Sequence, residues 1–133
     1  MKTPLAKIFF DYTKVNTLVE VLAQRIKQSN LPIKSISGVP RGGLIPAVLL
    51  SHKLNIPYTS RVNPNTLLVD DIVDTGETLK NTSALYTASL IHKPHTSVFT
   101  PTFYAHTHLT DGWIVFFWER LSAPAIQDYK NKD

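Results

Sequence analysis

The chain of 133 residues contains no cysteine. This absence excludes disulfide bonds, zinc sites built on thiolates and catalysis by a thiol nucleophile. It fits a cytoplasmic protein, and we expect the protein in that compartment. No stretch approaches the roughly 18 apolar residues of a membrane span, and the first residues lack the pattern of a signal peptide. We therefore expect no membrane partner.

Charged residues are also few, at 18% of the chain, and the lysines are scattered rather than clustered. A nucleic-acid surface usually gathers one sign of charge on a face, so no nucleic-acid partner is expected. The net charge of +4 suits attraction of a small polyanion. A hydrophobic content of 43% is typical of a packed core rather than of disorder. The length predicts a single domain over residues 1–133.

Strand-like and helix-like stretches alternate along the chain. Strands are expected at 7–12, 33–37, 56–60, 66–71, 96–103 and 113–118, and helices at 15–27, 44–54 and 77–91. Thr13 or Thr17 is the expected N-cap of the first helix. This alternation predicts an α/β fold with a mainly parallel, twisted sheet flanked by helices.

The most informative segment is 66–79, in which an apolar strand ends in Asp70 and Asp71. Asp74 and a Thr-Gly-x-Thr sequence over residues 75–78 follow directly. Paired acids rarely end a buried strand, because an unpaired buried carboxylate is costly. The two acids suit sugar hydroxyls or a divalent cation, and the hydroxyl and N–H groups of 75–78 suit a phosphate at the start of a helix.

A second unusual loop, Gly-Val-Pro-Arg-Gly-Gly, occupies residues 38–43. Both loops leave the carboxyl ends of predicted parallel strands, where ligands of such sheets bind, so we expect them to face one cleft. The glycines allow backbone N–H groups to approach a phosphate closely. Two phosphate sites on either side of a sugar-and-metal site predict a ribose that carries a 5-phosphate and a 1-pyrophosphate.

Two rival motifs were weighed. Residues 74–76 also match the Asp-Thr-Gly of aspartic proteases, but Glu77 and the helical pattern of 77–91 argue against a β context. That class would also give no role to the acids at 70 and 71. His106 and His108 share a strand face and could bind a metal, but no third ligand is evident, and a polar loop is the expected alternative.

Together these residues resemble the type I phosphoribosyltransferases, most closely the xanthine-guanine phosphoribosyltransferase branch. Segment 70–78 resembles the phosphoribosyl pyrophosphate motif of that family. Segment 40–46 resembles its pyrophosphate loop, often with a cis peptide at the position of Pro40–Arg41. Segment 113–119 is similar to the Trp-Ile-x-x-x-Trp-acid sequence of the branch. The resemblance runs from about residue 7 to 119 and implies a three-layer domain.

The resemblance implies an enzyme, a pentosyl-transferring glycosyltransferase that joins a purine-like base of the xanthine, guanine and hypoxanthine class to phosphoribosyl pyrophosphate. Asp74 would be the catalytic base, Asp71 would help to hold Mg2+, and the region of Glu119 would address the 2-position of the base and the metal. The family also implies an assembly of identical chains, a dimer or tetramer. The implied substrate contacts are Arg41, Gly42, Asp70, Asp71, Thr75, Gly76, Glu77, Thr78, Trp113 and Ile114.

The sequence departs from the family pattern in two places. Only residues 61–65 replace the long flexible loop that closes over the substrate, so we expect a reduced hood and no such loop. The purine enzymes carry a lysine that reads the 6-oxo group, and the matching strand, placed at 96–103, contains none. These departures leave a second hypothesis open: a non-catalytic module of the same fold that senses phosphoribosyl pyrophosphate or a nucleotide and regulates a partner.

Overall fold

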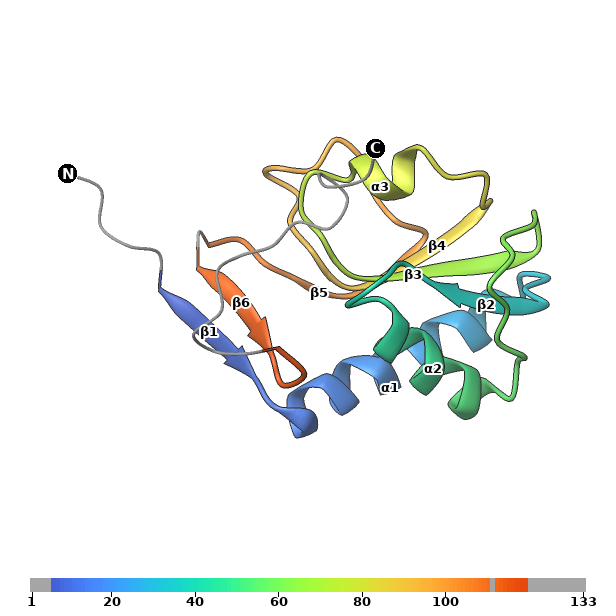
Figure 1. Cartoon of the computed structure of the whole chain (residues 1–133), viewed down its shortest axis with the longest axis horizontal. Coiled ribbons are helices and arrows are strands. Elements are labelled where there is room, and N and C mark those ends of the chain that lie inside the picture. Colours follow the sequence, from blue (N-terminus) through green and yellow to red (C-terminus); the bar gives the residue numbers. More distant parts are fainter. Residues whose placement is uncertain (1–5, 111, 120–133) are drawn as a thin grey trace.

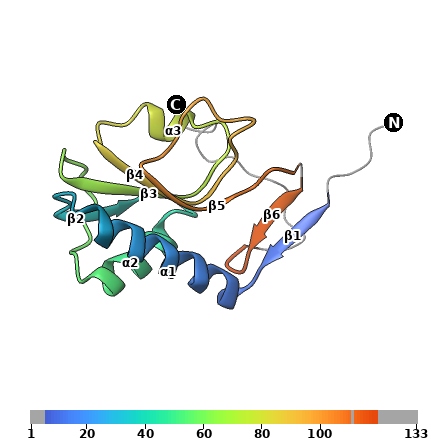
Figure 2. The ribbon, with the colours of Figure 1, turned by 180° about the vertical axis from the view of Figure 1, so that it is seen from behind.

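Four parallel strands form the central sheet of the computed structural model, which describes residues 6–110 and 112–119 (Figure 1). A separate pair of parallel strands lies to one side of that sheet, next to the start of the first helix (Figure 2). The central sheet has the order β2 (Ser35–Gly38), β3 (Thr66–Val73), β4 (Tyr86–His92) and β5 (Phe103–Thr107), and the pair consists of β1 (Lys7–Phe10) and β6 (Trp113–Phe116).

Helices cover both faces of the central sheet. Helices α1 (Tyr12–Ser29) and α2 (Leu44–Leu54) lie on one face, and the short α3 (Glu77–Lys80) lies on the other (Figures 1 and 2). This confirms the three-layer α/β architecture expected from the sequence. Among the helices that the structure describes, none has the length and apolar character needed to span a bilayer.

The main core lies between the sheet and the two long helices. Helix α1 contributes Val15, Val19 and Leu22, all fully buried, at the spacing of one helical face. They pack with central strand residues such as Leu67 and Leu90. Burying one such side chain stabilises the fold by about 1.5–3 kcal/mol, so these contacts hold α1 against the central sheet.

Helix α1 is capped by Asp11, not by Thr13 or Thr17 as the sequence predicted. The Asp11 carboxylate accepts a hydrogen bond of 2.8 Å from the backbone N–H of Lys14. The reason is positional: Asp11 directly precedes the first helical residue, whereas both threonines lie inside the helix. Asn30, with a φ of 56°, ends the helix in the left-handed conformation.

The helix expected over 77–91 is wrong, because α3 ends at Lys80 and residues 86–92 form strand β4. β4 is paired on both edges and is buried from Thr87 to His92. A strand covered on both faces shows no alternation of apolar and polar residues. Tyr86 and Leu90 are four residues apart and therefore also fit the spacing of a helix. This spacing is the reason for the wrong prediction.

Two other predicted strands differ in the structure. The strand expected at 96–103 is a loop, and β5 begins only at Phe103. The strand expected at 56–60 is reduced to one parallel bridge between Ile36 and Tyr58. The short connection predicted before β3 is confirmed. The Thr66 N–H donates to the Asn63 carbonyl oxygen at 3.0 Å and closes a tight turn, so no long loop lies at this place.

Candidate functional site

The two unusual loops lie side by side because β2 and β3 are neighbouring parallel strands. Gly38 is in register with Val69, and the chain leaves both strands at the same edge of the sheet. The Val39 N–H donates to the Val69 carbonyl oxygen at 2.8 Å. A Cβ atom on Gly42 would overlap with Oδ2 of Asp71, so the pyrophosphate-type loop packs directly on this carboxylate. The structure thus brings together the two loops that the sequence placed in one cleft.

Gly43 allows the first loop to approach strand β3 closely. A side chain at this position would overlap with the backbone carbonyl oxygens of Val69 and Val39, which cannot move aside. In the same loop the peptide bond between Pro40 and Arg41 is cis, and the Arg41 side chain is exposed. The backbone of this loop therefore lies against the end of β3.

Asp70 and Asp71 are half-buried in the second half of β3, which continues to Val73, two residues beyond the predicted end of the strand. The Asp71 N–H donates to Oδ1 of Asp70, and the Ile72 N–H donates to Oδ1 of Asp71, each at 2.8 Å. Carboxylate oxygens are ligands that Mg2+ prefers, and it is commonly bound by one or two carboxylates together with substrate phosphates. Among the described residues, no group of three or more His, Cys, Asp or Glu could hold a metal ion. The donors present therefore suit Mg2+.

The loop after β3 needs glycine at position 76. Gly76 has a φ of 84°, a conformation that residues with a side chain rarely adopt. A Cβ there would also lie 2.7 Å from both the Cβ of Phe99 and the Oγ of Ser97. Glu77 is exposed, and Thr75 and Thr78 are half-buried on either side of it. The loop expected to hold the 5-phosphate is thus pressed against the segment that follows β4.

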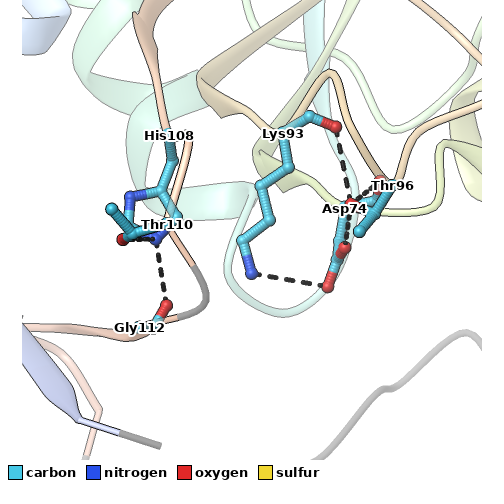
Figure 3. Close-up of polar contacts among 6 residues, drawn as sticks. All are labelled: Asp74, Lys93, Thr96, His108, Thr110 and Gly112. Carbon is cyan, nitrogen blue, oxygen red and sulfur yellow. Dashed lines mark hydrogen bonds and ion pairs between the residues drawn. The ribbon is translucent and has the colours of Figure 1, made fainter.

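Asp74 meets two residues of that following segment (Figure 3). Lys93 comes directly after β4, and its Nζ lies 3.6 Å from Oδ2 of Asp74, with only 9% of the lysine side chain exposed. The Thr96 hydroxyl donates to Oδ1 of Asp74 at 2.7 Å. The Lys93 ammonium also lies 5.6 Å from the ring centre of Trp113, in a cation–π arrangement. Asp74, Lys93 and Trp113 therefore surround one site.

Known proteins are similar to this chain in sequence and fold. The chain is 25% identical over 130 residues to a xanthine-guanine phosphoribosyltransferase of Cereibacter sphaeroides, an alignment that covers 75% of this chain and 77% of the relative. A purine phosphoribosyltransferase from Pyrococcus horikoshii superimposes with a TM-score of 0.72 at 29% identity, over 91% of this chain and 98% of that one. The chain shares the fold of the type I phosphoribosyltransferases. No family model matches it.

A third phosphoribosyltransferase supports the same placement. The xanthine-guanine-hypoxanthine phosphoribosyltransferase of Helicobacter pylori superimposes with a TM-score of 0.70 at 22% identity, over 94% of this chain and 97% of that one. These three proteins are phosphoribosyltransferases, enzymes of the pentosyl-transferring glycosyltransferase class, which confirms the enzyme class expected from the sequence. The parallel sheet also argues against the aspartic protease alternative. The helix over 77–91, on which the sequence argument against it relied, is not present, because α3 ends at Lys80.

Lys93 is a residue of this site that the sequence reasoning missed. The lysine was sought in a strand placed at 96–103, but the strand that follows the aspartate motif is β4, and Lys93 comes directly after it. The available signal was a Lys-Pro pair at the end of an almost uninterrupted run of apolar and small residues over 86–92. A lysine is therefore present beside Asp74, although the strand predicted at 96–103 contains none.

His108 holds the turn that leads to Trp113 (Figure 3). Its Nε2 lies 3.0 Å from the Gly112 carbonyl oxygen and 3.2 Å from Oγ1 of Thr110, and its ring is buried. His106 is exposed and belongs to β5, where its ring lies 6.2 Å from the ring of Phe10. His108 is thus occupied with the polar loop, which was the expected alternative to a metal pair.

A pocket with a volume of about 550 Å³ opens beside the first loop, on the α3 face of the sheet. Its lining includes Val39 and Pro40 from that loop, Tyr58 from the bridge region, and Thr78 and Asn81 at α3. The pocket borders both expected phosphate loops. It therefore extends the same site.

The burial of His92 predicts that the free energy of unfolding depends on pH. Burial lowers the pKa of His92 below its usual 6.5, and a hydrogen bond with the Phe99 backbone opposes this effect more weakly. Because the folded-state pKa is lowered, the neutral ring favours folding above about pH 6.5, and that contribution is lost as the pH falls through the folded-state pKa. Urea unfolding between pH 7.5 and 5 should therefore show a decline in the free energy of unfolding that His92→Gln makes shallower. Parallel curves for wild type and His92→Gln would contradict the assignment.

Proposed function

We propose that the protein transfers the phosphoribosyl group of phosphoribosyl pyrophosphate to a 6-oxopurine of the xanthine, guanine and hypoxanthine class, giving a nucleoside 5′-monophosphate and pyrophosphate. The observation that carries this proposal is the meeting of Asp74, Lys93 and Trp113 beside the two apposed loops. A carboxylate, a desolvated ammonium and an aromatic face are the three groups that a planar base with a 6-oxo group and an ionisable N–H requires. The names of the matched proteins support the same substrate class.

The sugar end of the substrate would lie over the end of β3. Asp70 and Asp71 would accept hydrogen bonds from the ribose hydroxyls, and residues 75–78 would hold the 5-phosphate through N–H and hydroxyl donors. Arg41 and the backbone at Gly42 would hold the pyrophosphate. Mg2+, bound through Asp71 and the oxygens of the substrate, would supply charge stabilisation for the departing pyrophosphate.

The transfer step requires a proton acceptor and a binding site for the base. As the bond from C1 of the ribose to pyrophosphate breaks, positive charge develops on the sugar, and the base nitrogen attacks C1. Asp74 would take the proton of that nitrogen, the role of a positioned general base. Trp113 would stack on the ring, and the backbone carbonyl of Ile114 would address its 2-position.

Lys93 would select the base. Its ammonium is mostly removed from water and already lies between the carboxylate of Asp74 and the ring of Trp113. An ammonium donates hydrogen bonds and accepts none, so it favours a carbonyl oxygen at the 6-position over an amino group. This arrangement supports a 6-oxopurine in preference to adenine.

One experiment tests the proposed function. The purified protein is incubated with phosphoribosyl pyrophosphate, Mg2+ and, in turn, hypoxanthine, guanine, xanthine, adenine and two pyrimidines, and new mononucleotides are identified by mass. We expect far more product from the 6-oxopurines than from adenine, none from the pyrimidines, and none from any base without Mg2+. The double variant Asp70→Asn, Asp71→Asn serves as the control for contaminating activity and should yield no product.

The second candidate, a non-catalytic binding module, is favoured by one observation: residues 61–65 form a tight turn where a closing loop would exclude water. Calorimetric binding of phosphoribosyl pyrophosphate without product from any base would support this module and contradict the enzyme. An absence of both binding and product would contradict both candidates. The dimeric or tetrameric assembly and the cytoplasmic location stay predictions.

A further inference from the structure

The hydroxyl of Thr96 connects the loop that carries Asp74 with the turn that carries Lys93 (Figure 3). Its Oγ1 lies 2.7 Å from Oδ1 of Asp74, 3.1 Å from the Asp74 carbonyl oxygen and 3.5 Å from the Lys93 carbonyl oxygen. A hydroxyl has one proton to donate, and an ionised carboxylate is the strongest acceptor of the three. The Thr96 O–H therefore donates to Oδ1 of Asp74.

Backbone hydrogen bonds hold this threonine in place from both sides. The Lys93 N–H donates to the Val73 carbonyl oxygen at 2.9 Å, and the Val98 N–H donates to the Thr75 carbonyl oxygen at 2.9 Å. The segment 93–98 is thereby attached to both ends of residues 73–75. The position of the Thr96 hydroxyl relative to Asp74 is consequently set by the main chain.

We propose that Thr96 is a positioning residue for the transfer reaction, and that it holds Oδ1 of Asp74 so that Oδ2 faces Lys93 and the base. The two carboxylate oxygens have separate partners, with Thr96 at Oδ1 and the Lys93 ammonium 3.6 Å from Oδ2. The terminal torsion of an aspartate is broad, so a carboxylate without a fixed donor samples many orientations. Fixing one oxygen raises the share of molecules in which the other is aligned with the proton of the base. This inference rests on the proposed function.

The test compares three variants in steady-state kinetics with hypoxanthine and phosphoribosyl pyrophosphate. Thr96→Val removes the hydroxyl at almost constant size, Thr96→Ser keeps it, and Thr100→Val changes another exposed threonine of the same loop. We expect Thr96→Val to lower kcat about fivefold to tenfold, with KM for phosphoribosyl pyrophosphate within about twofold of wild type, because proton transfer depends on alignment. Thr96→Ser and Thr100→Val should keep kcat within about twofold. Because Thr96 is exposed, the melting temperature should not change.

The outcomes separate this inference from the proposed function. If the wild-type protein forms no nucleotide with any base, the proposed function fails and this inference fails with it. If the wild type is active and Thr96→Val matches it in kcat, the positioning role alone is overturned. A loss in Thr96→Val that is accompanied by a lower melting temperature or weaker phosphoribosyl pyrophosphate binding, or that Thr96→Ser shares, shows a structural role and also overturns it.

Discussion

Replacing Asp74 with asparagine is expected to lower kcat by about 100-fold to 10,000-fold, the range in which a positioned general base contributes. Asparagine has the same shape and still offers an oxygen to the Thr96 hydroxyl, but it cannot take the proton of the base. The sugar and its phosphates would contact the end of β3 and residues 75–78 rather than the Asp74 carboxylate. Binding of phosphoribosyl pyrophosphate should therefore stay within about twofold of wild type.

Single-turnover product formation and calorimetry of phosphoribosyl pyrophosphate binding check this prediction separately. Asp11→Asn is the matched control: it makes the same chemical change at the N-cap of α1, where asparagine caps about as well as aspartate, and should leave both measurements unchanged. Full-rate turnover by Asp74→Asn would show that another group accepts the proton. A parallel loss of substrate binding would show that Asp74 contacts the sugar phosphate instead.

Replacing Lys93 with methionine is expected to lower kcat/KM for hypoxanthine by about 100-fold and to reduce the preference for hypoxanthine over adenine by a similar factor. Methionine fills the volume of the lysine stem but offers no donor to the 6-oxo group, which would then be buried without a hydrogen bond. The change also removes the cation next to Asp74, so part of the loss should appear in kcat. The loss for adenine should be much smaller.

The measurement is kcat/KM for each base at saturating phosphoribosyl pyrophosphate. Lys80→Met, at an exposed lysine in α3, is the control for a change of net charge and should behave as wild type. Equal losses with hypoxanthine and adenine would mean that Lys93 acts through Asp74 and does not read the base. Wild-type selectivity in Lys93→Met would assign the reading of the 6-position to another group.

The aspartate motif was predictable because its chemistry is local. Asp70, Asp71 and Asp74 follow one apolar run at fixed spacing, and the start of α2 at Leu44 directly after the glycine loop was also correct. A parallel α/β sheet then requires both loops to leave the same edge, which allowed their meeting to be inferred before any coordinates. The contact of Gly42 with Asp71 agrees with that inference.

The second half of the chain was less predictable because β4 is buried on both faces. With no alternation to mark it, residues 77–91 fitted a helix, and this error moved the next strand to 96–103 and hid the role of position 93. Small and apolar residues such as Ala88 and Ser89 are buried on both faces of β4. The sequence of this strand therefore lacks the alternation of polar and apolar residues that would have marked it. The Asp11 cap was missed for a simpler reason, since the helix begins three residues earlier than expected.

The order of residues along the chain was enough to specify an α/β sheet with two loops at one edge, the glycine loop at 38–43 and the segment that carries Asp70, Asp71 and Asp74. Only the folded arrangement showed that Lys93 and Thr96 contact Asp74, and that Trp113 contacts Lys93 from a separate segment. The reason is that spacing along a strand or loop encodes contacts within a few residues. Contacts between the ends of β3, β4 and β6 depend on how the sheet is paired and on where each strand stops.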